Sequence, residues 1–265
     1  MEKIQFTQAG SVQVPVKRIA IVTGASSGLG ADFARELARD NSLDELWLVA
    51  RRKDRLQQLA NELNKKCVVL ALDLTNPQDL QKLKKTLEKH QPDIRFLINN
   101  AGYGALGPAE DIDTEFQLKM IDLNAWALTA LTLYSIGYLG RGSIIIQVAS
   151  SAGFLPLANF AVYAATKAYV ISFSRAIGEE LKTRGIIVNT VCPGPVKTEF
   201  FQASGFADPA SAYNSLDVVK HALQRALRGK ALSVFGWRIL LYRYLYSFIP
   251  VWLVLKISKM IKQKK

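Results

Sequence analysis

Short apolar runs alternate with longer segments of helical periodicity between residue 18 and about residue 230. The first run, residues 18–23, reads Arg-Ile-Ala-Ile-Val-Thr and stops at a glycine. In the segment that follows, residues 28–40, Leu29, Phe33 and Leu37 recur at four-residue intervals, which is typical of one helical face. The runs are apolar throughout rather than at alternate positions, so strands buried on both faces are expected.

This alternation predicts a sheet of parallel strands. Strands are expected at residues 18–23, 45–50, 67–72, 94–99, 143–149, 186–191 and 231–235. Helices are expected at residues 28–40, 53–64, 77–90, 113–137 and 161–183. Strand and helix in turn imply right-handed crossovers, and therefore an α/β fold with a doubly wound, mainly parallel, Rossmann-like sheet. We expect one domain over residues 1–235 and a helical, basic extension over residues 236–265.

Composition narrows the class of protein. The 265 residues are 49% hydrophobic and 21% charged, as in an ordinary globular protein. There are two cysteines, two histidines and no Cys-x-x-Cys pair, which excludes a disulfide framework and argues against a metal site. We therefore expect no bound metal and a reducing, cytoplasmic setting. Residues 1–16 contain no continuous hydrophobic stretch, so neither a signal peptide nor an anchor is expected there.

Positive charge is concentrated at the C-terminal end of the chain. The net charge is +12, yet residues 218–265 contain eleven Lys or Arg and no Asp or Glu, which leaves +1 for the first 217 residues. We therefore expect a localised basic surface, and no nucleic-acid-binding surface spread over the fold.

A glycine cluster follows the first predicted strand, where ligands bind in doubly wound sheets. Residues 23–30, Thr-Gly-Ala-Ser-Ser-Gly-Leu-Gly, combine turn-forming glycines with a helix start whose free N–H groups favour phosphate. The cluster is interpreted as a pyrophosphate-binding loop or, alternatively, as a tight strand-to-helix turn alone. The candidate cofactor-binding residues here are Gly24, Ser26, Ser27, Gly28, Leu29 and Gly30.

Two arginines, Arg51 and Arg52, follow the second predicted strand. An acid at this position reads the ribose 2′-hydroxyl of NAD, whereas an arginine accommodates the 2′-phosphate of NADP. The pair therefore predicts NADP(H) as the cofactor, the alternative being a solvated basic helix start. After the third predicted strand, Asp73 and Leu74 are placed to contact adenine, and Asp73 is equally suited to cap the next helix.

Tyr163 and Lys167 are four residues apart in a predicted helix, so their side chains share one face. Free tyrosine titrates near pH ~10, and a neighbouring ammonium stabilises the phenolate and lowers its pKa toward the range useful for proton transfer. Ser150 ends the fifth predicted strand thirteen residues before Tyr163, which places a hydroxyl near the same pocket. The alternative is a surface tyrosine and lysine on an amphipathic helix.

Taken together, these motifs resemble the short-chain dehydrogenase/reductase family over roughly residues 18 to 200. The matching elements are Thr23-Gly24-x-x-x-Gly28-x-Gly30, Asn99-Asn100-Ala101-Gly102, Asn124, Ser150, Tyr163-x-x-x-Lys167 and Pro193-Gly194. The resemblance implies that Tyr163 exchanges a proton with the substrate oxygen, that Ser150 binds this oxygen and that Lys167 also holds the nicotinamide ribose. It implies that Asn124 completes the catalytic set by distorting its helix and holding a water, the alternative being a capping or interhelical hydrogen bond.

The resemblance also assigns residues around the cofactor. Asn99 is expected to brace the sheet. Further cofactor contacts are implied for Asn100, Ala101, Gly102, Pro193, Gly194, Val196 and Thr198. Relatives associate through the long helices that correspond to residues 113–137 and 161–183, so a homodimer or tetramer is expected.

Residues 199–213 are interpreted as a substrate-side lid whose phenylalanines, Phe200, Phe201 and Phe206, predict an apolar pocket. Residues 239–257 are rich in Leu, Tyr, Ile and Trp, but Arg243 and Pro250 interrupt them. Past Pro250, one helical face carries Leu253, Val254, Ile257, Met260 and Ile261, and another carries Lys256, Lys259 and Gln263. This pattern suits a helix in an anionic lipid interface. The alternatives are a subunit contact, a flap packed on the substrate cleft, and a transmembrane helix.

These observations predict an NADPH-dependent carbonyl reductase or alcohol dehydrogenase that acts on a lipophilic ketone, aldehyde or alcohol. We expect it in the cytoplasm, peripheral to a membrane. The alternative is a non-catalytic NADP(H)-binding regulatory protein or membrane-peripheral scaffold, which would need the glycine loop but not the catalytic set.

Overall fold

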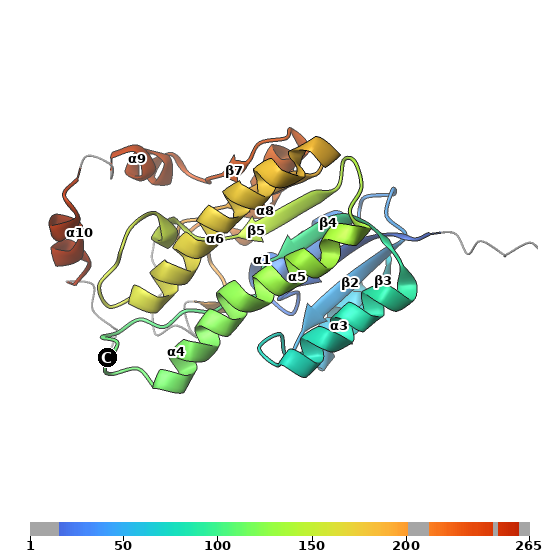
Figure 1. Cartoon of the computed structure of the whole chain (residues 1–265), viewed down its shortest axis with the longest axis horizontal. Helices are drawn as coiled ribbons and strands as arrows, with labels where there is room; N and C mark the ends of the chain where they lie inside the picture. The colour runs from blue at the N-terminus through green and yellow to red at the C-terminus, as the bar shows by residue number, and fades with distance from the viewer. Residues whose placement is uncertain (1–15, 201–211, 246–248, 260–265) are drawn as a thin grey trace, which may run out of the picture.

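The computed structural model describes residues 16–200, 212–245 and 249–259. Within these residues, seven parallel strands form one sheet in the order β3-β2-β1-β4-β5-β6-β7 (Figure 1). The strands are β1 Arg18–Thr23, β2 Glu45–Ala50, β3 Lys66–Ala71, β4 Asp93–Asn99, β5 Ile144–Val148, β6 Ile187–Val191 and β7 Leu232–Ser233. The predicted doubly wound fold is confirmed. Its order reverses between β1 and β4, whose carboxyl ends are where such sheets bind ligands.

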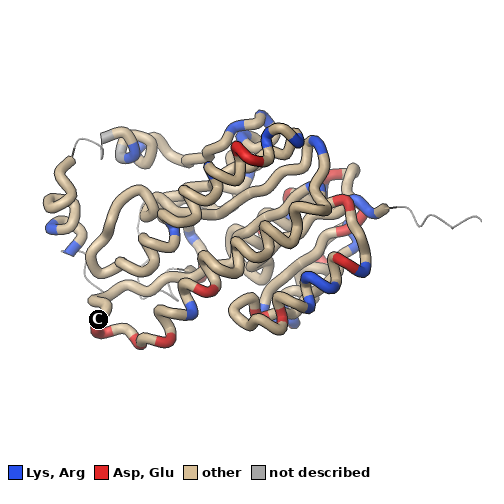
Figure 2. The backbone as a smooth tube through the Cα atoms, viewed as in Figure 1, with Lys and Arg blue, Asp and Glu red and all other residues tan. Residues whose placement is uncertain are grey.

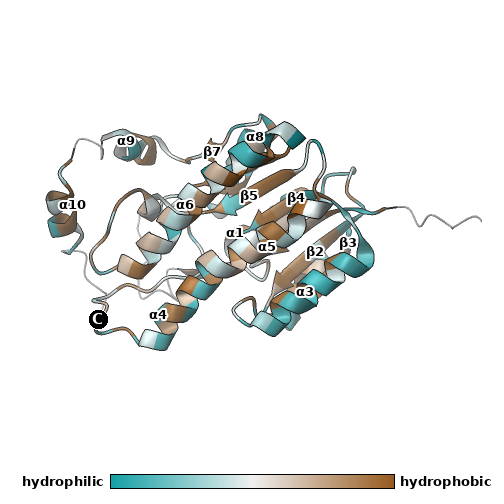
Figure 3. Cartoon of the chain, in the orientation of Figure 1, coloured by the Kyte–Doolittle hydropathy of each residue, from teal (hydrophilic) through white to brown (hydrophobic). Residues whose placement is uncertain are grey.

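Helices cover both faces of the sheet, and the apolar strands lie between them (Figure 3). One face carries α1 Gly28–Leu37, α2 Lys53–Glu62 and α8 Ser215–Leu227; the other carries α3 Pro77–His90, α5 Leu128–Ser135 and α6 Ala161–Leu181. Along β1, Ala20 and Val22 belong to the core on the first face, and Ile19 and Ile21 to the core on the second. Successive strand side chains point to opposite faces, which explains the continuous apolar runs.

The helix predicted at residues 113–137 is continuous in space but irregular. It consists of α4 Thr114–Ile121, a π-helical segment Asp122–Ala127, α5, and a 3-10 turn Ile136–Tyr138. Single π-helical turns inside α-helices are rare and occur mostly at functional sites. Asn124 lies in this segment and is fully buried, so a helix distortion is present at the residue for which it was expected.

Most element boundaries agree with the sequence pattern within a few residues, and β1, β2 and α3 have the predicted bounds. α8 was not predicted. Its buried stripe consists of Val218, Val219, Ala222 and Ala226. Half of this stripe is alanine, which contrasts little with polar neighbours, so the helical period is weak in the sequence.

Two short helices, α9 Trp237–Leu245 and α10 Val251–Ser258, follow the sheet. α9 packs near the 3-10 turn Ser151–Phe154, and its Ile239 contacts a small apolar cluster there. α10 reaches the loop before α6, where the Ala158 N–H donates to the Ser258 hydroxyl over 3.0 Å. Among the helices in the described ranges, none has both the length and the apolar character that a membrane crossing requires.

Candidate active site

Thr23 joins the carboxyl ends of β1 and β4. Its hydroxyl donates to the Ile98 carbonyl over 3.2 Å and accepts from the N–H groups of Asn100 (2.9 Å) and Ala101 (3.0 Å). The Asn100 amide donates to the Thr23 carbonyl over 2.9 Å. The glycine loop and the Asn-Asn-Ala-Gly segment, both predicted to bind the cofactor, therefore lie side by side where the strand order reverses.

Three positions of the glycine loop require glycine. Gly24 and Gly28 have φ values of +66° and +53°, a left-handed conformation that other residues rarely adopt. A Cβ at Gly30 would lie 2.2 Å from the Gly24 carbonyl oxygen, so any side chain there would displace the loop. The glycines therefore leave the backbone of the loop uncovered by side chains, so that a ligand could approach it closely.

The start of α1 has no side-chain cap, and the same holds for α2 and α6, whereas α3, α4 and α8 have one. Asn76, Asp113 and Asn214 each accept a backbone N–H at the start of α3, α4 and α8. Ser27 makes no such bond at the start of α1, and its hydroxyl instead accepts from Arg52 over 2.9 Å. No side chain therefore occupies the first N–H groups of α1 in the described structure, which leaves them available to an anion.

Arg52 lies against the glycine loop and pairs with the segment after β6. Its guanidinium donates to the Ser26 hydroxyl over 3.0 Å and to Glu199 over 2.8 Å. Arg55, from α2, donates to Glu199 over 2.7 Å, and the two arginines hold the pKa of that carboxyl below its usual range. Arg51 is exposed and forms no ion pair within the described ranges.

Asp73 shapes the turn after β3 and does not cap α3. Its carboxylate accepts from the N–H and the hydroxyl of Thr75, over 3.0 and 2.8 Å, whereas Asn76 caps the helix. The capping alternative for Asp73 is therefore wrong, because the helix begins later in the chain. Leu74 is buried in the core, so a cofactor would meet its backbone rather than its side chain.

Tyr163 and Lys167 lie on the inner face of α6, next to the carboxyl end of β5. The Lys167 Nζ atom lies 5.6 Å from the centre of the Tyr163 ring and donates to the Val148 carbonyl over 2.9 Å. Ser150, just past β5, hydrogen-bonds Tyr163 and also accepts from a backbone N–H of the following 3-10 turn. Tyr163 and Lys167 are both buried, so the surface-pair alternative is wrong.

Asn124 links the π-helical segment to this pair. Its amide oxygen accepts from the Tyr103 N–H over 3.1 Å, and its amide nitrogen donates to the Tyr103 carbonyl (2.9 Å) and the Thr166 hydroxyl (3.1 Å). The interhelical hydrogen bond considered for Asn124 is therefore present, between the π segment and α6. A Cβ at Gly102 would lie 2.8 Å from Asn124 and 3.3 Å from Lys167, so only glycine leaves space there.

Burial sets the pKa values of the two central residues. It raises the pKa of Tyr163 to about 12, and the hydrogen bond with Ser150 opposes this only in part. It lowers the pKa of Lys167 to about 8. The expected lowering of the tyrosine pKa by the ammonium is therefore outweighed by desolvation of the phenolate. At neutral pH Tyr163 carries its proton.

Phenylalanines flank Tyr163 on two sides. The Phe160 ring stacks on it with centres 4.4 Å apart, and the Phe200 ring is tilted against it at 5.4 Å. Phe201 and Phe206, also predicted for the lid, lie outside the described residues. The surroundings of the tyrosine are apolar from both the loop before α6 and the start of the predicted lid.

The segment after β6 is tied to the site at three points. The Ser151 N–H donates to the Pro193 carbonyl over 2.9 Å. Val196 forms a parallel bridge with Tyr213, beyond the undescribed part of the lid. The Thr198 side chain lies against the glycine loop, 3.0 Å from where a Cβ would replace the Gly28 hydrogen. The residues predicted to cover the nicotinamide thus stand opposite those predicted to bind phosphate.

Gly194 packs closely against α9. A Cβ at this position would lie 2.8 Å from the Ile239 side chain.

Phe160 and Thr166 were not predicted from the sequence as contributors to the site, and neither were the ion pairs of Glu199, the first residue of the predicted lid. Glu199 is 147 residues from its partner Arg52, and Thr166 is 42 residues from Asn124. Local periodicity carries no signal for such contacts. The one available signal was position, since Phe160 and Thr166 both lie within three residues of Tyr163.

Comparison with known proteins agrees with this geometry. The sequence model of the family described as short chain dehydrogenase matches residues 18–207. An uncharacterized oxidoreductase of Staphylococcus epidermidis is 31% identical over 211 residues, covering 78% of this chain and 91% of the relative. The very-long-chain 3-oxoacyl-CoA reductase of Bos taurus is 32% identical over 192 residues, covering 68% of this chain and 60% of the relative.

Solved structures share the whole architecture. A short-chain dehydrogenase from Sphingobium yanoikuyae in complex with NADPH is 28% identical with a TM-score of 0.78, covering 94% of this chain and 98% of that one. A short-chain dehydrogenase/reductase from Burkholderia phymatum in complex with NAD is 20% identical with a TM-score of 0.76, over 94% and 97% of the two chains. The second likeness bears on the fold alone.

Proposed function

Because this chain belongs to the short-chain dehydrogenase family, we propose that it is an NADPH-dependent reductase of lipophilic ketones or aldehydes. The observation that carries the proposal is a buried Tyr163 with Ser150 and Lys167 around it, next to a glycine loop shaped for a dinucleotide. A bound nicotinamide dinucleotide supplies the hydride, or accepts it in the reverse direction. The remaining chemistry belongs to the side chains of this chain.

Tyr163 is the proton donor in this proposal. A substrate carbonyl oxygen placed between the Tyr163 and Ser150 hydroxyls accepts a hydrogen bond from each, which favours the negative charge that develops on it. Tyr163 then gives its proton to that oxygen. A pKa of about 12 keeps the donor loaded at neutral pH, which suits reduction.

Lys167 positions the site and supports the proton transfer. Its ammonium donates to the Val148 carbonyl and lies close to Gly102, in the segment that we propose lines the cofactor. A positive charge 5.6 Å from the Tyr163 ring stabilises the phenolate left after the transfer. The same residue thus serves cofactor binding and catalysis.

The preference for NADPH rests on the charge after β2. No acidic side chain directly follows this strand in sequence, and Arg51 and Arg52 occupy the first two positions after it. The NADPH-bound relative from Sphingobium yanoikuyae supports the proposal. The lipophilic substrate rests on the rings of Phe160 and Phe200 around Tyr163, and on the name of the Bos taurus relative, a reductase of very-long-chain acyl substrates.

The turnover test compares wild type with Tyr163→Phe on a panel of aliphatic and aromatic ketones and aldehydes, following NADPH oxidation. We expect a loss of about 10²–10⁴-fold in kcat for the variant, because the proton donor is gone while the ring remains. Tyr138→Phe, on a 3-10 turn remote from the site, is the matched control and should keep full activity. Turnover by Tyr163→Phe at the wild-type rate would refute the assigned mechanism.

A second titration tests the cofactor. We expect Arg51→Ala to weaken NADPH binding by about tenfold and NADH binding by less than twofold, since one phosphate contact is worth about 1.5 kcal/mol or more. Lys53→Ala, an adjacent exposed cation at the start of α2, is the control. Equal affinity of the wild type for both cofactors would contradict the NADPH preference but leave the oxidoreductase proposal standing.

The alternative function, a non-catalytic dinucleotide-binding regulator, is distinguished by the same experiments. It shares the glycine loop but has no use for a buried tyrosine and lysine whose burial costs free energy. Tight NADPH binding together with no turnover on any carbonyl compound would favour it.

A further inference from the structure

The two helices after the sheet present their apolar side chains outward. On α9, the exposed positions Trp237, Leu240, Leu241 and Tyr244 follow the spacing i, i+3, i+4, i+7, which makes them one continuous stripe. Ile239 faces the protein instead, against Gly194. In an ordinary surface helix the apolar stripe faces the core, so α9 has the opposite arrangement.

α10 has the same inverted arrangement. Val251, Trp252 and Leu255 are exposed, whereas the residues that turn toward the protein include Val254 and Ser258. Trp237 and Trp252 are 69% and 66% exposed, although tryptophan is usually well covered. The apolar face predicted for this segment is therefore only partly buried, since Ile257 is also exposed.

The charge around these stripes is of one sign. Residues 218–265 contain eleven Lys or Arg and no acidic residue. All charged side chains in the described parts of α9 and α10 are therefore basic (Figure 2). Exposed tryptophan and leucine with lysine or arginine and no acid are the composition of helices that lie in an anionic lipid interface. A protein partner with an apolar groove would not require this absence of acid.

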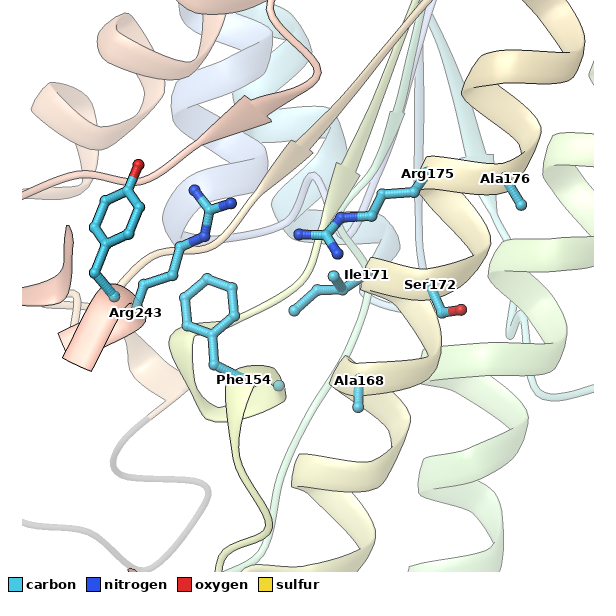
Figure 4. Close-up of a pocket in the computed structure, with 9 residues that line it drawn as sticks. Phe154, Ala168, Ile171, Ser172, Arg175, Ala176 and Arg243 are labelled. Carbon is cyan, nitrogen blue, oxygen red and sulfur yellow. The ribbon is translucent and has the colours of Figure 1, made fainter. Parts of the chain in front are cut away.

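A basic pocket adjoins the same helices (Figure 4). It has a volume of about 570 Å³ and lies between α9, α6 and the 3-10 turn Ser151–Phe154. Arg243 of α9 and Arg175 of α6 both direct their guanidinium groups into it. Neither forms an ion pair with any acidic side chain of the described chain. The Arg243 guanidinium lies over the rings of Phe154 and Tyr244, at 6.0 and 5.5 Å, which leaves its charge without an anionic partner.

We propose that α9 and α10 form a docking surface for anionic phospholipid membranes, with the apolar stripes inserted among the lipids and the Arg175–Arg243 pocket holding a lipid phosphate. The proposal does not depend on the reaction proposed above. Membrane docking would nevertheless affect the proposed active site, because α10 is hydrogen-bonded to the loop that leads to Phe160 and Tyr163. The Ala158 N–H donates to the Ser258 hydroxyl, and the Asn159 amide donates to the Lys259 carbonyl over 3.3 Å. Docking places that loop at the lipid surface.

The experiment measures co-sedimentation of the full-length protein with two kinds of vesicle. One is phosphatidylcholine alone, and the other is phosphatidylcholine with about 30% of the anionic lipid phosphatidylglycerol. We expect the wild type to bind the anionic vesicles at least about tenfold more tightly, and doxyl-labelled acyl chains to quench its tryptophan fluorescence. Trp237→Ser with Trp252→Ser should lose about tenfold or more in affinity. The control, Val16→Ser with Leu227→Ser, removes two side chains of similar exposure elsewhere and should bind as the wild type does.

A second pair of variants tests the pocket. Arg175→Gln with Arg243→Gln should weaken binding to anionic vesicles by about tenfold. Lys220→Gln with Arg228→Gln, which removes the same charge from α8 and the residue that follows it, should weaken binding less. Unchanged NADPH affinity and unfolding temperature show that each variant is folded. The proposal is overturned if the wild type fails to bind anionic vesicles at 0.15 M salt. It is equally overturned if the tryptophan variant binds them normally while a wild-type oligomer dissociates, which assigns the stripe to a protein contact.

Discussion

Lys167 is a buried hydrogen-bond donor as well as the cation that we propose for catalysis. Among the described residues no carboxylate pairs with its ammonium, which donates to the Val148 carbonyl beside Asn124 and Gly102. Burial lowers its pKa to about 8, well below the ordinary value of 10.5. Burial of the Lys167 ammonium therefore lowers the stability of the folded protein. Strongly shifted pKa values of this kind cluster at functional sites.

This cost has a pH dependence that can be measured. Below pH 8 the lysine is protonated in both folded and unfolded chains; between pH 8 and 10.5 the unfolded chain binds more protons, so stability from this group rises with pH. We expect Lys167→Met to raise the free energy of unfolding by about 2 kcal/mol at pH 7, after allowing for the lost hydrogen bond to Val148, and by much less at pH 10.

Urea unfolding at pH 7 and pH 10 checks this expectation. Lys85→Met, at an exposed position of α3, is the control and should show a small difference that does not change with pH. An equal effect of Lys167→Met at both pH values would contradict the lowered pKa. The variant should also be inactive, but activity is not needed for the test.

Asn124 lies in the π-helical segment that interrupts the long helix between α4 and α5. The π-helical segment places its amide where it bonds both the N–H and the carbonyl of Tyr103 and reaches Thr166 on α6. The long helix, the loop after β4 and α6 are thereby fixed at one point. The distortion is local, because regular α-helix continues on both sides.

Removing this amide should destabilise the whole fold. We expect Asn124→Ala to lower the free energy of unfolding by about 2–4 kcal/mol, because it leaves buried groups of Tyr103 without partners. Asn61→Ala, on the exposed face of α2 where only a Gln57 contact is lost, should cost less than about 0.5 kcal/mol. Thermal or urea unfolding of both variants measures the difference, and equal effects would show that the Asn124 bonds are dispensable.

Glu199, at the start of the predicted lid, forms ion pairs with Arg52 and with Arg55 of α2. Glu199 accepts from both Arg52 and Arg55 at partly exposed positions, so the carboxylate stands close to where we expect a 2′-phosphate. An anion there competes with the phosphate for Arg52. The contact also sets the position of the lid's first residues.

We expect Glu199→Gln to tighten NADPH binding by about three- to tenfold and NADH binding by less than twofold, since a like charge is removed and Arg52 is released. Fluorescence titration of both cofactors measures it. Glu62→Gln, whose carboxylate pairs with Arg35 instead, is the control. Weaker NADPH binding by Glu199→Gln would mean that the ion pair orders the site instead of competing for it.

The helices and strands were largely predictable. In a doubly wound sheet the strands are buried on both faces, so they appear in the sequence as nearly uninterrupted apolar runs such as residues 45–50. Tyr163, Lys167 and Ser150 were predicted from the family resemblance together with their spacing and their position near a strand end. What could not be predicted was set by long-range packing. The π-helical turn at Asn124, the shift of the Tyr163 pKa by burial and the Glu199 ion pairs all depend on partners far away in sequence. The alanine-rich α8 failed for a local reason, since its apolar stripe is weak.

On the scale of the molecule, a second apolar surface lies on the adjacent helices α4 to α6. Its exposed members are Phe116, Leu118, Ile121, Trp126, Leu133 and Tyr169. Unlike the tail helices, these elements pack closely on one another and on the sheet (Figure 1). This is the region expected from the family resemblance to join subunits.

We expect the protein to form a dimer through this surface, and Leu133→Lys to convert it to a monomer at micromolar concentration, because an unpaired charge would be buried in the contact. Light scattering after size-exclusion chromatography measures the mass. Leu227→Lys, at an exposed position of α8 on the opposite face of the sheet, should leave the mass unchanged. A wild type that elutes as a monomer would rule out this contact.

The described chain starts and finishes at opposite ends of the molecule (Figure 1). The chain enters β1 at the end of the molecule opposite α10, and α10 is bonded to the loop before α6. An affinity tag or fluorescent reporter on the C-terminal side would follow α10, the helix bonded to the loop before α6, whereas one on the N-terminal side would precede β1. Immobilising the protein from the β1 end would therefore leave α9 and α10 facing the solution.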